Sequence, residues 1–122
     1  MEFPPYAALL NLRMFPDAPG ELVMPWSDAV TGRPGFVHGG ALAGLLEIAA
    51  LAEAQRYLDG RSAKPVGISV EYLRGGRAVE TRAAATVVRL GRTVASLSAT
   101  AWQESRDKPI AAARLTLLLG DQ

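Results

Sequence analysis

The longest apolar stretch of the chain lies in its first half. Residues 39–57 consist mostly of leucine and alanine, and apolar residues fall on every side of the helix that this stretch would form. Gly39 and Gly40 open the stretch, and Asp59 and Gly60 follow it, so the pattern predicts one long helix that ends near Tyr57. A helix that is apolar all round belongs inside a domain. We therefore expect other elements to wrap around it.

A different pattern follows the helix. Apolar and polar positions alternate in four segments, residues 66–73, 79–90, 93–104 and 110–119, and turn-forming residues separate them. The pattern predicts four strands, and their short connections predict antiparallel neighbours. Because a buried helix needs a sheet curved around it, we expect an α+β domain with an antiparallel β-sheet wrapped around one long central helix.

The region before the long helix predicts smaller elements. Residues 6–13 are typical of a short helix, residues 21–26 of a strand, and residues 28–35 of a loop rich in Gly, Pro, Asp and Thr. Residues 1–122 contain no internal repeat, linker or low-complexity segment, so we expect one domain.

Composition narrows the possible chemistry. The 122 residues carry a formal net charge of +1, which gives no support to a nucleic-acid-binding role. With no cysteine and one histidine, His38, the sequence excludes disulfides, thiolate chemistry and multi-histidine metal sites. The N-terminus lacks a signal-peptide pattern, and the apolar run 41–54 is interrupted by Glu47 and Glu53 and is too short to span a bilayer. We expect a cytoplasmic protein without a membrane segment.

The start of the long helix carries the chemistry. Gly39 and Gly40 follow His38, and a helix N-terminus offers free backbone N–H groups and the positive end of the helix dipole to a developing oxyanion. Glu47 lies two turns further on, in an otherwise apolar run. The positions that share its face are Ala43, Gly44, Ala50 and Leu51, three of them small, which leaves space beside the carboxylate. These residues predict a catalytic site that combines an oxyanion-stabilising helix N-terminus with a carboxylate.

The spacing of these groups predicts a dimer. Gly39 and Glu47 are eight positions apart, or roughly 12 Å along a helix axis. An oxyanion donor must come within about 3 Å of the carbonyl oxygen, and a base must reach the attacking water. One helix cannot supply both groups, whereas two antiparallel helices related by a two-fold axis can do so twice.

Each candidate also has a structural interpretation. Glu47 could pair with an arginine from a strand, and His38 could cap the helix or pack the loop before it. We expect Trp26 and Trp102 to be core or interface aromatics, and Glu53 to lie at the exposed end of the helix.

The chain resembles the PaaI-like branch of the hotdog-fold acyl-CoA thioesterases over nearly its whole length. The order of the predicted elements agrees with that family. The matching residues are Gly35-Phe36-Val37-His38-Gly39-Gly40, Glu47 with Ile48-Ala49, Val70-Glu71-Tyr72-Leu73-Arg74, Val88-Arg89-Leu90-Gly91-Arg92, and Pro5-Tyr6 with Leu9-Leu10.

The resemblance implies hydrolysis of acyl-CoA thioesters by a homodimer with a continuous sheet, often a homotetramer, with coenzyme A as part of the substrate and no other cofactor. Carried over by position, Glu47 is the general base or nucleophile, the Gly39 N–H polarises the thioester carbonyl, and His38 orients the loop or the carbonyl. Many relatives carry Asn or Gln about six residues before the histidine, where this chain has Gly32, and a hydroxyl one turn after the acid, where it has Leu51.

Substrate contacts follow from the same resemblance. Gly40 is expected beside the substrate, and Arg74, Arg89 and Arg92 could meet the phosphates of coenzyme A, since arginine suits phosphate recognition. The alternative interpretation is that each arginine is a solvent-exposed side chain at the end of a strand, with no role in binding. Two other functions stay open: an acyl thioester dehydratase or hydratase on the same scaffold, and a non-catalytic acyl-CoA-binding module, which Gly32 favours.

Overall fold

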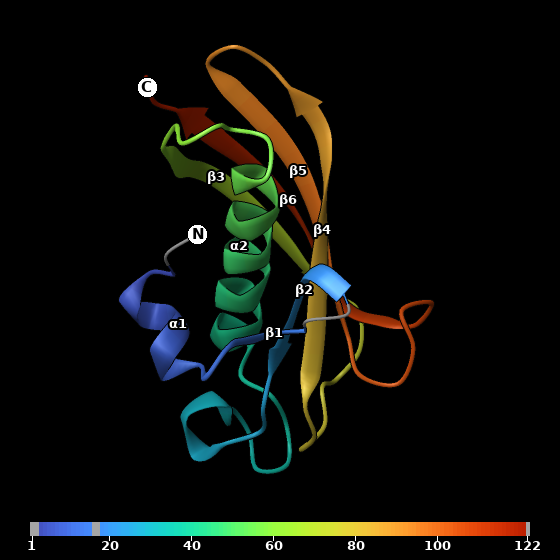
Figure 1. Ribbon diagram of the computed structural model, residues 1–122. Coiled ribbons are helices and arrows are strands. Elements are labelled where there is room, and N and C mark those ends of the chain that lie inside the picture. The colour runs from blue at the N-terminus through green and yellow to red at the C-terminus, as the bar shows by residue number, and fades with distance from the viewer. Residues whose placement is uncertain (1–2, 16–17, 122) are drawn as a thin grey trace.

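The computed structural model describes residues 3–15 and 18–121, which form a curved sheet against one long helix (Figure 1). The elements in chain order are α1 (Pro5–Leu9), β1 (Arg13–Phe15), β2 (Ala18–Met24), a 3₁₀ turn (Asp28–Val30), α2 (Gly39–Gln55), β3 (Ala63–Tyr72), β4 (Thr81–Leu90), β5 (Val94–Trp102) and β6 (Pro109–Leu119). Helix α2 contacts β2, β3, β4, β5 and β6. The predicted α+β architecture, a sheet wrapped around a central helix, is confirmed.

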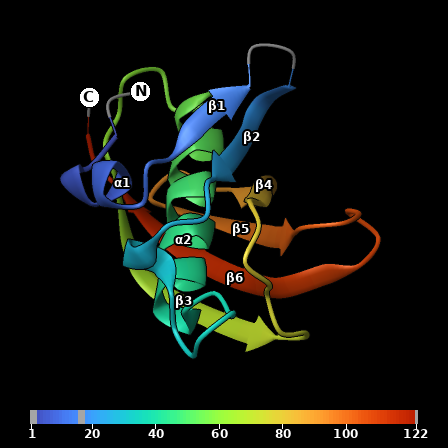
Figure 2. The same ribbon diagram turned by 90° about the horizontal axis from the view of Figure 1, so that it is seen from below.

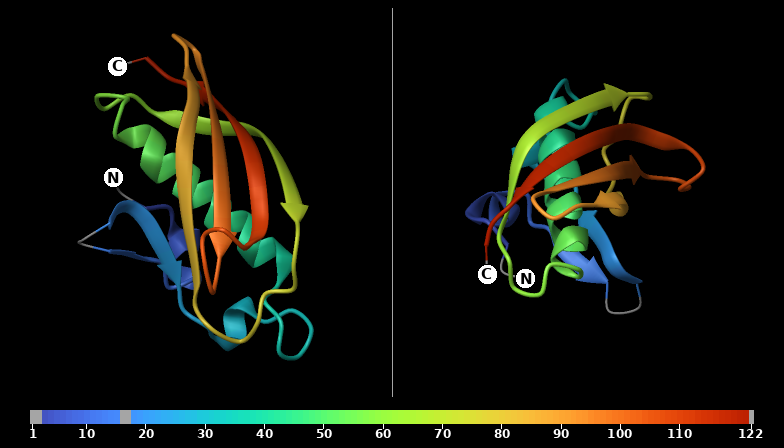
Figure 3. Two further views of the ribbon diagram at one scale, coloured as in Figure 1. Left: turned by 90° about the vertical axis from the view of Figure 1, so that its right-hand side faces the viewer. Right: turned by 90° about the horizontal axis from the view of Figure 1, so that it is seen from above.

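The six strands pair antiparallel in the order β1-β2-β4-β5-β6-β3 (Figure 3). The expectation that successive strands are neighbours holds for β4, β5 and β6 and is wrong for β3 and β4. Strand β3 pairs with β6 instead, and residues 73–80 carry the chain past the ends of β6 and β5 to β4. Two hydrogen bonds hold the start of this crossing, from the N–H groups of Leu73 and Arg74 to the Ile110 carbonyl.

Small inward-facing residues let the helix lie close to the sheet. In β5, buried positions alternate along the strand as Ala95, Leu97, Ala99 and Ala101, and alanines also face inward from β4 and β6. Most apolar residues of α2 are buried against them. Because alanine side chains fill little space, the leucines of α2 occupy the room between the layers. Trp102, at the end of β5, is also buried, but it does not belong to the core cluster around α2.

The N-terminal helix is shorter than predicted. Helix α1 ends at Leu9 because Asn11 has a positive φ of 56°, and Arg13 begins strand β1, which the sequence pattern did not predict. Helix α1 lies beside α2 on the side opposite the sheet (Figure 2). A Cβ atom on Gly44 of α2 would lie only 2.5 Å from the Tyr6 ring, so the absence of a side chain there lets α1 approach.

The C-terminal end of α2 differs from expectation in one residue. Glu53 was predicted to be exposed, but only 9% of it is accessible. Its Oε1 lies 2.9 Å from Nη1 of Arg56, and a Cβ atom on Gly20 of β2 would lie equally close, at 2.9 Å. The carboxylate raises the pKa of Arg56 through this hydrogen bond and charge attraction. Strand β2 covers Glu53, a contact that the helix pattern cannot reveal.

Helix α2 is followed by a left-handed turn, with Asp59 at φ 49° and Gly60 at φ 85°, which confirms the predicted end of the helix to within two or three residues. Within the described ranges, no helix combines the length and apolar character needed to cross a membrane.

Candidate active site

The N-terminus of α2 is built around His38. His38 is the N-cap residue, and its Nδ1 accepts a hydrogen bond of 2.9 Å from the Gly40 N–H. The loop before it is held by two backbone bonds, from the His38 N–H to the Val30 carbonyl (2.7 Å) and from the Val37 N–H to the Gly76 carbonyl (2.9 Å). The capping interpretation of His38 is therefore confirmed, and its role toward substrate stays a prediction.

This cap determines which donors remain free. The Gly40 N–H is occupied by His38, whereas the Gly39 N–H has no acceptor among the residues that the structure describes. Because Nδ1 of His38 accepts a hydrogen bond, the neutral imidazole carries its proton on Nε2. The helix start thus offers the Gly39 N–H as a free backbone donor beside the cleft, and His38 offers a side-chain donor. Position 40 tolerates no side chain here, since a Cβ atom would lie 2.8 Å from Cε1 of His38.

Tyr72 completes this arrangement and was missed as a functional residue in the sequence. It is the last residue of β3, and its hydroxyl donates a hydrogen bond of 2.9 Å to the Gly39 carbonyl. A Cβ atom on Gly39 would lie 3.3 Å from Cζ of Tyr72, so ring and backbone are in close contact. The peptide between Gly39 and Gly40 is held at its carbonyl by Tyr72 and at its N–H by His38. The alternation of Val70 and Tyr72 with polar neighbours was the available signal.

A cleft of about 420 Å³ opens beside this helix end. It contains His38, Gly39 and Tyr72 together with two cationic side chains and no carboxylate. Its lining is Gly32, Arg33, Phe36, Val37, His38, Gly39, Leu42, Tyr72, Arg74, Gly75 and Gly76. The positive charges and the helix N-terminus make the cleft suitable for a polarised carbonyl or an anion.

Gly32, which stands where many relatives carry Asn or Gln, is tightly packed. A Cβ atom there would lie 3.0 Å from the His38 Cα, and the Gly32 N–H bonds to the Phe36 carbonyl at 2.9 Å. A side chain at this position presses on the backbone that sets the helix cap.

Glu47 is separated from Gly39 within one chain. It is half-buried in the middle of α2 and does not line the cleft. In the part of the chain that the structure describes, its carboxylate forms no hydrogen bond or ion pair, so the structural alternative of an arginine partner is not seen. The predicted space on its face is partly filled, because the Tyr6 ring lies over Gly44.

The three predicted arginines do not come together. Arg74 lines the cleft, whereas Arg89 and Arg92 line a hollow of about 180 Å³ at the β4–β5 hairpin. Arg61, which follows α2, donates to the Arg92 carbonyl at 2.7 Å, so this hairpin lies near the C-terminal end of α2. The hairpin is at the top of Figure 1, and the N-terminal end of α2, beside which the cleft opens, is at the bottom.

An antiparallel sheet wrapped around an apolar helix, with a free donor at the start of that helix, defines a hotdog-fold thioesterase. The chain belongs to the family described as the acyl-CoA thioesterase N-terminal domain, whose model matches residues 28–118. The resemblance seen in the sequence is thereby confirmed, and the protein is a thioesterase. Comparison with curated proteins found no match.

Solved structures of similar proteins agree with this assignment. A thioesterase family protein from Silicibacter pomeroyi is 30% identical, with a TM-score of 0.86, covering 98% of this chain and 91% of that chain. A phenylacetic acid degradation-related protein from Ralstonia eutropha is 26% identical, with a TM-score of 0.81 and coverage of 97% and 92%. A Bacillus halodurans protein crystallised with CoA is 24% identical, with a TM-score of 0.83 and coverage of 93% and 74%, and shows the same fold.

Proposed function

We propose that this thioesterase hydrolyses acyl-CoA thioesters to a free acid and coenzyme A in a homodimer. The observation that carries the proposal is the free Gly39 N–H at the start of α2, beside a cationic cleft that contains no carboxylate. A thioester carbonyl accepting this N–H gains stabilisation as its oxygen becomes negative in the tetrahedral intermediate. The reaction needs water and no further cofactor.

The proposed dimer supplies the acid or base that the cleft lacks. Glu47 from the second copy removes a proton from water as the water attacks the carbonyl carbon, or it attacks that carbon itself and forms an anhydride that water hydrolyses after the thiolate has left. The thioester C–S bond then breaks, and the sulfur leaves as the thiolate of coenzyme A and takes up a proton. Head-to-tail packing of two α2 helices brings the Gly39 end of one to the Glu47 of the other.

The edge strand β3 is the proposed contact. It is long and its outer edge has no partner strand among the described elements. Three large apolar residues on or next to it, Val66, Ile68 and Leu73, are exposed. An exposed apolar edge is a template for pairing, and a second β3 would continue the sheet across the dimer. The same two-fold axis carries Arg89 and Arg92 toward the partner's cleft, where we propose that they meet the substrate. A pair of such dimers would form the expected tetramer.

The roles of the clamping residues follow from their bonds. Tyr72 and His38 hold the Gly39–Gly40 peptide from both sides, which fixes the backbone immediately after the Gly39 N–H and so steadies that donor beside the cleft. Gly40 contributes by leaving room for the His38 ring. Nε2 of His38 remains as a donor toward the carbonyl or the leaving group. In this arrangement Nδ1 of His38 accepts a hydrogen bond and Nε2 donates one. This disfavours the dehydratase alternative, because the histidine of a dehydratase must exchange a proton with its substrate.

The test is the Glu47→Gln variant. We expect thiol release from acyl-CoA to fall by about 10²- to 10⁴-fold, the usual contribution of a positioned base, with the dimer and the circular dichroism spectrum unchanged. Glu80→Gln, which removes an exposed carboxylate in a loop, is the matched control and should retain activity. Full activity of Glu47→Gln would remove Glu47 from the mechanism. Acyl-CoA binding without thiol release by the unmodified protein would instead support a binding module.

A further inference from the structure

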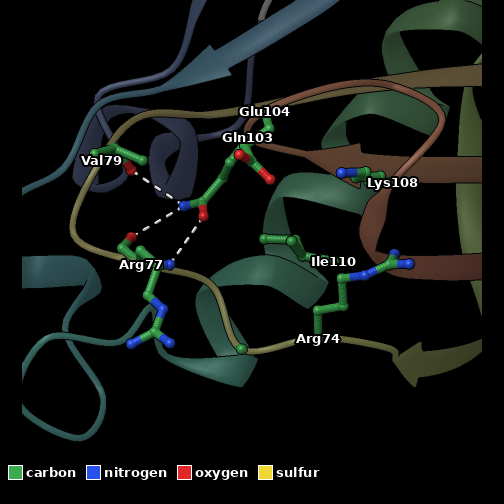
Figure 4. A pocket seen from close by; sticks show the side chains of 8 residues that line it. Arg74, Arg77, Val79, Gln103, Glu104, Lys108 and Ile110 are labelled. Atoms are coloured by element: carbon green, nitrogen blue, oxygen red, sulfur yellow. Dashed lines mark hydrogen bonds between the residues drawn. The ribbon is translucent and has the colours of Figure 1, made fainter.

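The side chain of Gln103 holds the segment that crosses from β3 to β4. Gln103 directly follows β5, and Figure 4 shows its amide facing Arg77 and Val79. Its Oε1 accepts a hydrogen bond of 2.8 Å from the Arg77 N–H. Its Nε2 donates to the carbonyls of Arg77 (3.0 Å) and Val79 (3.3 Å) and lies 3.1 Å from Oγ1 of Thr81, which is fully buried. Both ends of the amide are therefore engaged within the chain.

The crossing segment, residues 73–80, is anchored at two separate places. Its start is held by the two bonds to the Ile110 carbonyl. The glycine pair 75–76 follows, and glycine leaves the backbone free to adopt other conformations. The first anchor therefore does not determine where Arg77 lies. Gln103 does so, because it bonds to both the N–H and the carbonyl of that residue.

The crossing segment in turn holds the loop that ends at His38. The Gly76 carbonyl accepts a hydrogen bond of 2.9 Å from the Val37 N–H. Next to this bond, Phe36 and Arg77 form an antiparallel bridge. The contact is close, since a Cβ atom on Gly76 would lie 3.1 Å from Cγ2 of Val37. Val37 directly precedes His38, the N-cap residue of α2, so a displacement at Arg77 is passed to the cap through the backbone.

Side chains link the same two segments. The Arg77 guanidinium lies 4.8 Å from the ring centre of Phe36, and the Arg33 guanidinium lies 4.4 Å from the same ring. Such contacts between a cation and an aromatic ring are attractive. Phe36 lines the cleft, so the position of Arg77 also affects the cleft wall.

We propose that Gln103 is a positioning residue for the Gly39 N–H. By fixing Arg77, its amide holds the loop before α2 and thereby the His38 cap. The inference rests on the proposed function, in which the Gly39 N–H receives the thioester oxygen. Gln103 is not among the residues that line the cleft, so its effect passes through the backbone that it holds. An oxyanion donor is effective when its position is fixed before the reaction, so a loosened cap lowers kcat.

The kinetic test is Gln103→Met, which keeps an unbranched side chain of similar length and removes the amide. We expect kcat to fall roughly three- to tenfold, less than the about 10²-fold or more that follows removal of an oxyanion donor, with KM little changed. The fall should be equal for an acyl-CoA and for the N-acetylcysteamine thioester of the same acyl group, because the donor contacts the carbonyl that both share. Glu104→Gln, which changes the exposed neighbour in the same loop, is the control and should keep full activity.

Gln103→Asn is the second variant, for the case that Gln103→Met does not fold. It keeps an amide but shortens the side chain by one methylene group, so the amide no longer reaches Arg77, and kcat should fall in the same way. An unchanged kcat in a folded variant would overturn the proposal. A loss confined to acyl-CoA would do so as well, because Gln103 would then act on the coenzyme and not on the carbonyl donor.

The His38 ring provides a readout that a general loss of stability would not change. His38 is the single histidine of the chain, so its ring nitrogen signals in nuclear magnetic resonance spectra are unambiguous. In the folded Gln103 variants we expect both signals to move toward those of an unbound imidazole, because the bond from the Gly40 N–H to Nδ1 is weakened. Unchanged ring signals would contradict the proposal. If the unmodified protein cleaves neither thioester, the proposed function fails, and the ring signals still decide whether Gln103 holds the cap.

Discussion

The Tyr72 hydroxyl is the most direct test of how the oxyanion donor is oriented. Tyr72→Phe removes one oxygen atom and keeps the ring that packs against Gly39. The hydrogen bond lost is the one of 2.9 Å to the Gly39 carbonyl. His38 continues to hold the other end of the same peptide through the Gly40 N–H. The substitution therefore loosens the peptide without emptying the cleft.

The magnitude follows from the exposure of the bond. A neutral hydrogen bond contributes about 0.5–1.5 kcal/mol net, and Tyr72 is 55% exposed, so water can partly replace its hydroxyl. We take the lower part of that range, about 0.5–1 kcal/mol. If this energy is lost mainly in the transition state, kcat falls about two- to fivefold, since about 1.4 kcal/mol corresponds to a factor of ten. KM should change little because the ring stays in place.

The assay is continuous detection of thiol release over a range of acyl-CoA concentrations, with Tyr57→Phe as control. Tyr57 is also exposed and lies just after the opposite end of α2. A double-mutant cycle with His38→Ala separates positioning from any direct contact, because two residues that hold one peptide should give non-additive losses in kcat. An unchanged kcat in Tyr72→Phe, or a change confined to KM, would refute the positioning role.

Two further predictions concern the helix start and the sheet edge. Gly40→Ala places a Cβ atom 2.8 Å from the His38 ring, so we expect the His38 cap to be displaced and kcat to fall. The loss of the cap costs about 1 kcal/mol but is largely offset by the better helix propensity of alanine, so urea denaturation should show only a small change in unfolding free energy. A retained kcat would contradict the assignment of His38. Ile68→Lys puts a charge on the exposed face of β3, so we expect monomers in sedimentation analysis and little thiol release, and an active monomer would contradict the shared site.

The local pattern of apolar and polar residues was enough to predict most of the helices and strands of this protein. The position of α2 followed from a mostly apolar run between the glycine pair at 39–40 and Asp59-Gly60, and β4, β5 and β6 followed from alternation. These signals depend on residues within a few positions of one another, because backbone geometry determines which nearby residues share one face of a helix or a strand. Gly39 and Glu47 were identified in the same way, because a polar residue or a glycine pair is conspicuous in an apolar helix.

Contacts between distant segments were decided only by the tertiary structure. Strand β3 passes its neighbour in sequence and pairs with β6, which brings Tyr72 to Gly39, 33 residues away along the chain. The same packing covers Glu53 with β2, and it places Arg74 at the cleft while Arg89 lies at the far end. Hydrophobic pattern specifies which face of a strand is buried, but the order of strands depends on how the whole sheet closes around α2. The order is set when the strands pack together against the buried face of α2, and no segment encodes it alone.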